Sequence, residues 1–280
     1  MAQLIREEVQ MTAAGPSAQS ALIEQLSSGV LTLTLNRPER LNAFNGALRE
    51  ALASSLKRAA ASEECRAVLL TGAGRGFSAG ADLTERALAP GAAPPDLGEA
   101  LEKGFNPLVR ALRRLPKPVV CAVNGPAAGV GANLAFACDI VLAAKSATFL
   151  QAFARVGLVP DGGGTWSLPR LVGDARARAL MLLAEPVRAE HAAAWGLIWR
   201  AVDDDQLMGE ARTLAERLAA GPTRAYGLMK RAFAASSANS LDAQLDLERD
   251  LQREAGRSPE FAEGVRAFLE KRTPDFQGKP

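Results

Sequence analysis

Three short apolar runs, each enclosed by turn-forming residues, set the frame of this chain. The clearest spans residues 119–123, where valine fills three of five positions between a Lys-Pro pair and an Asn-Gly pair. A short run of this kind predicts a buried strand. Residues 66–71 and 139–143 have the same character. We therefore expect an α/β protein with at least three buried strands.

Other patterns surround these strands. Residues 21–26 and 30–35, joined by Ser-Ser-Gly, predict a β-hairpin. A short strand is expected at 197–202. Helical periodicity is found at 45–61 with Asn45 as N-cap, and also at 99–115, 168–183 and 189–195.

The order of these patterns predicts three regions. Residues 1–20 have no clear period and predict a mobile N-terminal extension. Residues 21–202 predict a β-rich α/β core, and residues 203–280 form a succession of helical patterns. An Ala/Pro-rich stretch at 84–98 predicts a loop or a partly ordered lid.

Composition narrows the class of protein. The chain has 280 residues, of which 33 are basic and 31 acidic, so its formal charge of +2 favours neither nucleic acid nor an anionic membrane as partner. Its three cysteines lack CxxC spacing, which favours reduced thiols in a cytoplasmic protein over a metal site. The chain has no run of about eighteen apolar residues, so the sequence predicts no transmembrane helix.

The stretch 119–139 (VVCAVNGPAAGVGANLAFACD) predicts a strand, a glycine-rich turn and the start of a helix. Unpaired backbone N–H groups at a helix start can hold an oxyanion, and glycine lets a ligand approach the backbone. A tight turn that binds no ligand is the alternative interpretation.

A second glycine-rich loop, GAGRGFSAG, follows the strand at 66–71. Its Gly-x-Gly-x-x-Ala spacing is weak support for a dinucleotide site, because no acidic residue ends a next strand about twenty residues on. Gly76–Gly80 also matches the G-x-S-x-G elbow of serine hydrolases, with Ser78, Asp161 and His191 in the required order. Against that alternative, Ser78 does not directly follow the strand.

A third hypothesis joins the two loops. If both lie at the ends of neighbouring strands, the amides of Ala81 and Val130 could converge on one oxygen and stabilise an enolate, each by about 3 kcal/mol. Asp161, in the apolar segment GLVPDGGGTW, is the candidate proton carrier. An apolar setting raises a carboxyl pKa towards the range useful for general base catalysis. The alternative is that Asp161 only caps the turn at 162–164.

Four motifs in order, LNRPERLNAFN, AVLLTGAGRGFSAGADL, AVNGPAAGVGANLAFACDIVLA and GLVPDGGGTWSLPRLVG, resemble the crotonase (enoyl-CoA hydratase/isomerase) superfamily. The resemblance implies a ClpP-like spiral of ββα units with a C-terminal helical trimerisation region, assembled as a homotrimer or a hexamer. It implies an acyl-CoA substrate whose thioester oxygen lies between the amides of Ala81 and Val130. Coenzyme A is then part of the substrate, and no other cofactor is expected.

Departures from the family pattern indicate the reaction. Hydratases of the family add water with two glutamates, and those positions align with Asn133 and Phe153, neither of which is an acid or a base. Asp161 falls where isomerases of the family carry a proton-shuttling aspartate. The resemblance therefore implies isomerisation of a CoA thioester by a single carboxylate.

Within the superfamily, the sequence is most similar to the ring epoxide isomerases of aerobic phenylacetate degradation. A Δ3,Δ2-enoyl-CoA isomerase would use the same residues, and a non-catalytic binding homologue is a further alternative. The resemblance also implies residues that contact the substrate or its CoA. Phe268 and Lys271 would reach the site of a partner subunit. The alternative is that Phe268 is a core residue and Lys271 a solvated charge. The other residues so implied are Arg40, Leu41, Ala79, Asp82, Leu83, Asn133 and Phe153.

Overall fold

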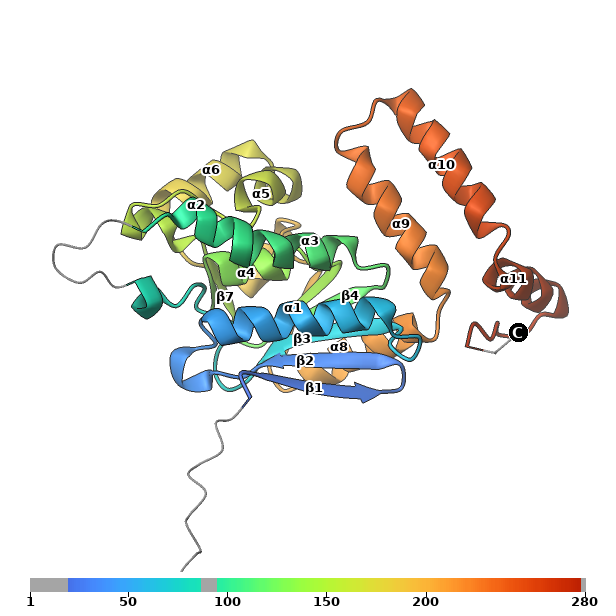
Figure 1. Cartoon of the computed structure of the whole chain (residues 1–280), viewed down its shortest axis with the longest axis horizontal. Coiled ribbons are helices and arrows are strands. Elements are labelled where there is room, and N and C mark those ends of the chain that lie inside the picture. Colours follow the sequence, from blue (N-terminus) through green and yellow to red (C-terminus); the bar gives the residue numbers. More distant parts are fainter. Residues whose placement is uncertain (1–19, 87–94, 278–280) are drawn as a thin grey trace, which may run out of the picture.

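The computed structural model describes residues 20–86 and 95–277. Within these residues the main sheet has six strands in the order β1-β2-β3-β4-β6-β9. Figure 1 shows β1, β2 and β3 side by side. The first two strands form an antiparallel hairpin, and every later pair is parallel. The strands are β1 (Leu22–Ser27), β2 (Val30–Leu35), β3 (Ala67–Gly72), β4 (Val119–Val123), β6 (Ile140–Ala144) and β9 (Arg200–Val202).

A smaller sheet and a set of helices surround the main sheet. Three short strands pair in the order β5-β7-β8, namely β5 (Ala127–Ala128), β7 (Thr148–Leu150) and β8 (Val187–Arg188). The helices are α1 (Gly46–Ala61), α2 (Leu97–Ala100), α3 (Asn106–Arg114), α4 (Val130–Phe136), α5 (Gly164–Val172), α6 (Asp174–Leu183), α7 (Ala189–Ala194), α8 (Leu207–Ala219), α9 (Thr223–Ser236), α10 (Leu241–Ala255) and α11 (Pro259–Glu270).

Local sequence patterns account for the central elements. β4 is apolar and buried along its whole length, and β3 is apolar and buried over Ala67–Leu70, as parallel strands covered on both faces are. The predicted hairpin is confirmed, and so is the N-cap of α1, where the side chain of Asn45 accepts a hydrogen bond from the Leu48 amide at 2.9 Å. The α/β class expected from the sequence is confirmed.

Two predicted helices are divided in the structure. The helix expected at 168–183 is two helices, because Gly173 lies between α5 and α6 with φ +79° and ends the first. The helix expected at 99–115 begins earlier, as α2, and passes through a π-helical turn at Leu101–Phe105 before α3. The predicted extension at 1–20, apart from Ser20, and most of the Ala/Pro-rich loop lie outside the described residues.

The C-terminal helices divide into two groups. α8 packs against β3, β4 and β6 and so completes the core, whereas α9 packs on α3, and α10 packs on α9. Figure 1 shows α10 and α11 standing off from the sheet. Among the described residues, no helix combines the length and the apolar character needed to cross a membrane.

One lysine fastens α9 to the core. The Nζ atom of Lys230 lies 2.7 Å from Asp139 Oδ2, and it donates to the carbonyl oxygens of Leu112 and Lys117. Asp139 Oδ2 also accepts from the Val119 amide, so this contact joins α9 to the first residue of β4. The Lys230 side chain is only 10% exposed, whereas that of Asp139 is 28% exposed and retains its hydrogen bond from the Val119 amide if the lysine is lost.

We predict that Lys230→Met destabilises the folded protein by about 2 kcal/mol, because the Asp139 carboxylate loses its cation and two carbonyls lose a donor. Adding Asp139→Asn should recover part of the loss, since no unpaired charge then remains. Urea unfolding of the wild type and both variants measures the difference. A loss below about 1 kcal/mol would show that this contact does not hold the helix.

Candidate active site

The backbone amide of Ala81, in the glycine-rich loop after β3, has no hydrogen-bond partner among the residues that the structure describes. Ala81 forms an isolated parallel bridge with Phe44. The Phe44 amide donates to the Gly80 carbonyl, and the Asp82 amide donates to the Phe44 carbonyl. In a parallel bridge of this pattern the middle residue turns its own N–H to the opposite side. Within the described residues, the Ala81 amide accordingly donates no backbone hydrogen bond.

The loop after β4 supplies a second such amide beside the first. Val130 is the first residue of α4, where N–H groups have no partner in the helix. Gly80, with φ +94°, brings the two loops together, because a Cβ atom there would lie 3.7 Å from the Val130 nitrogen and 2.8 Å from the Ala128 carbonyl oxygen. Two backbone donors thus lie side by side at the carboxyl ends of neighbouring parallel strands.

Asp161 enters this region on a turn that packs against α4. A Cβ atom on Gly162 would lie 3.0 Å from Val130 Cγ2, so the residue after Asp161 is in contact with Val130. The turn is closed by the backbone carbonyl of Asp161, which accepts from the Gly164 amide at 3.0 Å. Asp161 is half-buried.

Asn133 and Phe153 lie on two sides of the same region. Asn133 is 1% exposed and donates from Nδ2 to the Asp161 carbonyl oxygen at 2.7 Å. Phe153 is also buried, and its ring tip lies 3.7 Å from the position of a Cβ atom on Gly129, the residue before the Val130 amide. An amide and a phenyl ring therefore border the two backbone donors, and neither can transfer a proton.

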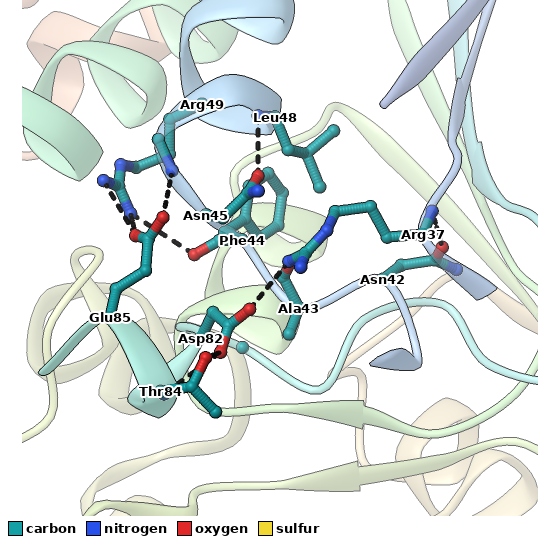
Figure 2. A network of polar contacts seen from close by, with 12 residues as sticks. Arg37, Asn42, Ala43, Phe44, Asn45, Leu48, Arg49, Asp82, Thr84 and Glu85 are labelled. Atoms are coloured by element: carbon teal, nitrogen blue, oxygen red, sulfur yellow. Dashed lines mark hydrogen bonds and ion pairs between the residues drawn. The ribbon is translucent and has the colours of Figure 1, made fainter. Parts of the chain in front are cut away.

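A polar network fixes the loop that carries Ala81 (Figure 2). Arg37 Nη1 donates to Asp82 Oδ2 at 2.9 Å and to the Ala43 carbonyl, while Asp82 Oδ1 accepts from the hydroxyl and amide of Thr84. The Thr84 hydroxyl and the Arg37 guanidinium lower the pKa of Asp82 to about 2. The Asp82 carboxylate thus bonds to other residues of the chain. Because Asp82 directly follows Ala81, these bonds hold the Ala81 amide in place.

The same network reaches α1. Glu85 accepts from the Gly46 amide at 3.0 Å and pairs with Arg49 (Figure 2). An acidic group at a helix start is favourable because it faces unpaired N–H groups and the positive end of the helix dipole. The Arg37–Asp82 and Arg49–Glu85 pairs therefore tie the segments 37–49 and 80–85 together on either side of the Phe44–Ala81 bridge.

Other residues expected to contact coenzyme A lie on the surface. Leu41 is half-exposed, and Arg40, Ala79 and Leu83 are exposed; the Ala79 amide donates to the Leu41 carbonyl at 2.8 Å, which places these two segments side by side. Phe268 is 82% exposed on α11, so it is not a core residue of its own chain, and Lys271 follows it at the end of that helix. Their part in a partner's site stays a prediction.

The structure disfavours both rival interpretations of the second loop. Ser78 is fully buried, and its hydroxyl donates to the Asn42 carbonyl at 2.9 Å, whereas His191 lies on α7 and stacks on Trp195. A serine nucleophile needs an exposed hydroxyl bonded to its base. The dinucleotide loop also fails, because the chain after Gly80 forms a bridge and a 3-10 turn where that site requires a helix.

Comparison with known proteins agrees with this arrangement. The enoyl-CoA hydratase/isomerase family model matches residues 25–279. The chain belongs to this crotonase family. It is 55% identical to the 1,2-epoxyphenylacetyl-CoA isomerase of Escherichia coli, over 92% of this chain and 98% of that protein.

Two further members of the crotonase family are similar over comparable lengths. A Rhodobacter capsulatus protein named a probable enoyl-CoA hydratase is 50% identical over 91% of this chain and 97% of its own. The crystal structure of an enoyl-CoA hydratase from Polaromonas superposes with a TM-score of 0.84 at 35% identity, covering 91% of this chain and 98% of that one. The crotonase fold expected from the sequence is confirmed.

Sequence reasoning missed two groups in this crotonase site. Gln151 donates to Asn133 Oδ1 at 2.9 Å, and Arg37 bonds Asp82 at 2.9 Å. The two residues of each pair are far apart in the sequence, by 18 positions in the first pair and by 45 in the second. No local pattern signals such contacts. Within the described residues no group of three or more His, Cys, Asp or Glu could hold a metal ion.

We predict that Asp82 makes the stability of the protein depend on pH in the acid range. An unfolded aspartate titrates near pH 3.9, whereas folded Asp82 has a pKa of about 2, so its stabilising effect is complete above about pH 4 and is lost as the pH falls towards about 2. Asp82→Asn should therefore lose less unfolding free energy than the wild type over that interval. Urea unfolding at both ends measures this, and equal losses would contradict it.

Proposed function

We propose that this protein isomerises 1,2-epoxyphenylacetyl-CoA to the seven-membered oxepin-CoA in aerobic phenylacetate degradation. The observation that carries the proposal is the 55% identity to the isomerase named for that substrate, over nearly the full length of both chains. The site geometry supports it, because Ala81, Val130 and the turn of Asp161 come together from three separate segments.

In the proposed reaction Asp161 takes a proton from the carbon next to the thioester. The electron pair moves onto the thioester oxygen, which the amides of Ala81 and Val130 stabilise as an enolate. Electron flow through the ring then opens the bond shared by the epoxide and the ring. Asp161 returns the proton to a ring carbon, so no atom is gained or lost, and no cofactor beyond the coenzyme A of the substrate takes part.

The residues around the enolate favour isomerisation over hydration. Hydration needs a base to activate water and an acid to protonate carbon, and the family positions for those glutamates are occupied by Asn133 and Phe153. Phe153 and the neighbouring apolar surface suit a substrate with a ring. A Δ3,Δ2-enoyl-CoA isomerase activity is the second candidate, since it needs only the same single carboxylate and the same two amides.

We propose that the protein works as a homotrimer or a hexamer in the cytoplasm. The helical arm α9–α11 supports association, because it exposes large apolar side chains that water does not favour: Phe233, Leu241, Phe261, Phe268 and Leu269. Phe268 and Lys271 would then reach the coenzyme A of a neighbouring subunit. Arg40, Leu41, Ala79 and Leu83 would contact the coenzyme A bound to their own subunit.

We predict that Asp161→Asn keeps the fold and the binding of CoA esters but lowers turnover by about 10²–10⁴-fold, because the amide cannot accept the proton. Asp174→Asn, which removes an exposed carboxylate on α6, is the matched control and should retain full activity. Turnover is measured on the epoxide, generated in place by its epoxidase, and on a 3-enoyl-CoA ester.

Three outcomes of that assay differ in meaning. Preferential conversion of the epoxide that depends on Asp161 agrees with the proposal. Fast conversion of the 3-enoyl ester alone would make the protein a general enoyl-CoA isomerase. A loss below about tenfold in Asp161→Asn would remove this residue from the role of acid and base.

A further inference from the structure

Two buried amide side chains form a chain of hydrogen bonds that ends at the backbone carbonyl of Asp161. The Nδ2 atom of Asn133 donates to the backbone carbonyl oxygen of Asp161 at 2.7 Å, and the Nε2 atom of Gln151 donates to Asn133 Oδ1 at 2.9 Å. Both side chains are almost completely buried, Asn133 at 1% exposure and Gln151 at 4%. They come from α4 and from the segment after β7, so the line crosses from one element to another.

The direction of this line is fixed by chemistry. A backbone carbonyl can only accept a hydrogen bond, so Asn133 must turn its NH₂ group towards Asp161. Its oxygen then faces Gln151, which must present its own NH₂ group in turn. The Asp161 carbonyl therefore sets the orientation of Asn133, and Asn133 sets that of Gln151. A group at position 151 that could only accept would oppose this orientation of Asn133.

Glycines hold the Asp161 turn against the Asn133 side chain. A Cβ atom on Gly164 would lie 2.6 Å from Asn133 Nδ2, and one on Gly162 would lie 3.2 Å from Asn133 Cβ. Both distances are closer than an added side chain tolerates without movement. The backbone next to Asp161 therefore lies directly on α4, the helix whose first residue is Val130.

We propose that Gln151 and Asn133 form a positioning relay, which sets where the Asp161 carboxylate lies relative to the Val130 amide. Neither side chain touches the reacting atoms in this proposal, which rests on the function proposed above. Because proton transfer requires the base within hydrogen-bond reach of the carbon, a small displacement of the Asp161 backbone lowers kcat strongly. Ground-state binding of the CoA ester does not depend on the relay.

The test replaces one amide of the relay by a carboxyl group of the same shape, which can donate a hydrogen bond when it is neutral but not when it is ionised. In Asn133→Asp the neutral carboxyl group can still donate to the Asp161 carbonyl and accept from Gln151. The ionised form can only accept, so it repels that carbonyl. A carboxyl group buried there without a cation has a raised pKa. The activity of the variant relative to the wild type should therefore be highest at low pH and fall as the pH rises.

Gln151→Glu provides a second, independent variant. Its neutral form donates to Asn133 Oδ1 as glutamine does, whereas its ionised form makes Asn133 reverse, and the same pH signature follows. The matched control is Asn239→Asp, which alters another Asn–Gln pair, in which Asn239 donates to Gln244 of α10 at 3.0 Å, and which contains no residue of the site. The kcat ratio of the control to the wild type should not change with pH.

The readout is kcat and KM for the epoxide ester across pH, with its epoxidase in excess so that isomerisation limits the rate. We expect the kcat of both relay variants to fall by about 10–100-fold relative to the wild type from the acid to the alkaline end, with KM nearly unchanged. A kcat ratio that stays constant across pH in both variants, or a change confined to KM, overturns the relay. If only one variant folds, its ratio decides alone.

Failure of the relay is distinguishable from failure of the proposed function. A wild type that converts the epoxide, with relay variants that show no pH signature, overturns the relay and leaves the function standing. A wild type that does not convert the epoxide overturns the proposed function and the catalytic role of the relay with it.

Discussion

The site depends on one constraint, the close approach of two loops that follow neighbouring parallel strands. At Gly80 the backbone comes so near to the Ala128 carbonyl oxygen that no side chain could be added without displacing it, and the Val130 nitrogen lies next to the same position. This approach is what puts two unpaired backbone donors side by side. Because backbone amides cannot rotate away as side chains can, they offer a fixed hydrogen-bonding site for an oxygen that becomes charged during a reaction.

Much of the fold could be predicted from the sequence, because local patterns determine its parts. The hairpin, the buried strands and the Asn45 cap all follow from residues within a few positions of one another. The division at Gly173 was missed although a glycine marks it, because the apolar period continues on both sides.

The sequence indicated the residues of the candidate site but not the contacts that hold them. The composition of the glycine-rich loops and of the segment around Asp161 marked these residues as candidates, and the family resemblance implied their roles. The contacts that hold them are between distant residues, as with Arg37 and Asp82, 45 positions apart, or Asn133 and Asp161, 28 positions apart. Such pairs form only when strand order and register are fixed, so no sequence pattern could indicate them.

The central claim is that the amides of Ala81 and Val130 together hold a thioester oxygen. The most direct measurement is isotope-edited infrared difference spectroscopy of the thioester carbonyl in bound phenylacetyl-CoA, which lacks the epoxide and stays intact. Two donors withdraw electron density from the carbonyl, so its stretching band should move to lower frequency, equally in the wild type and in Asp161→Asn. A band that remains at its solution frequency in both proteins would contradict the account.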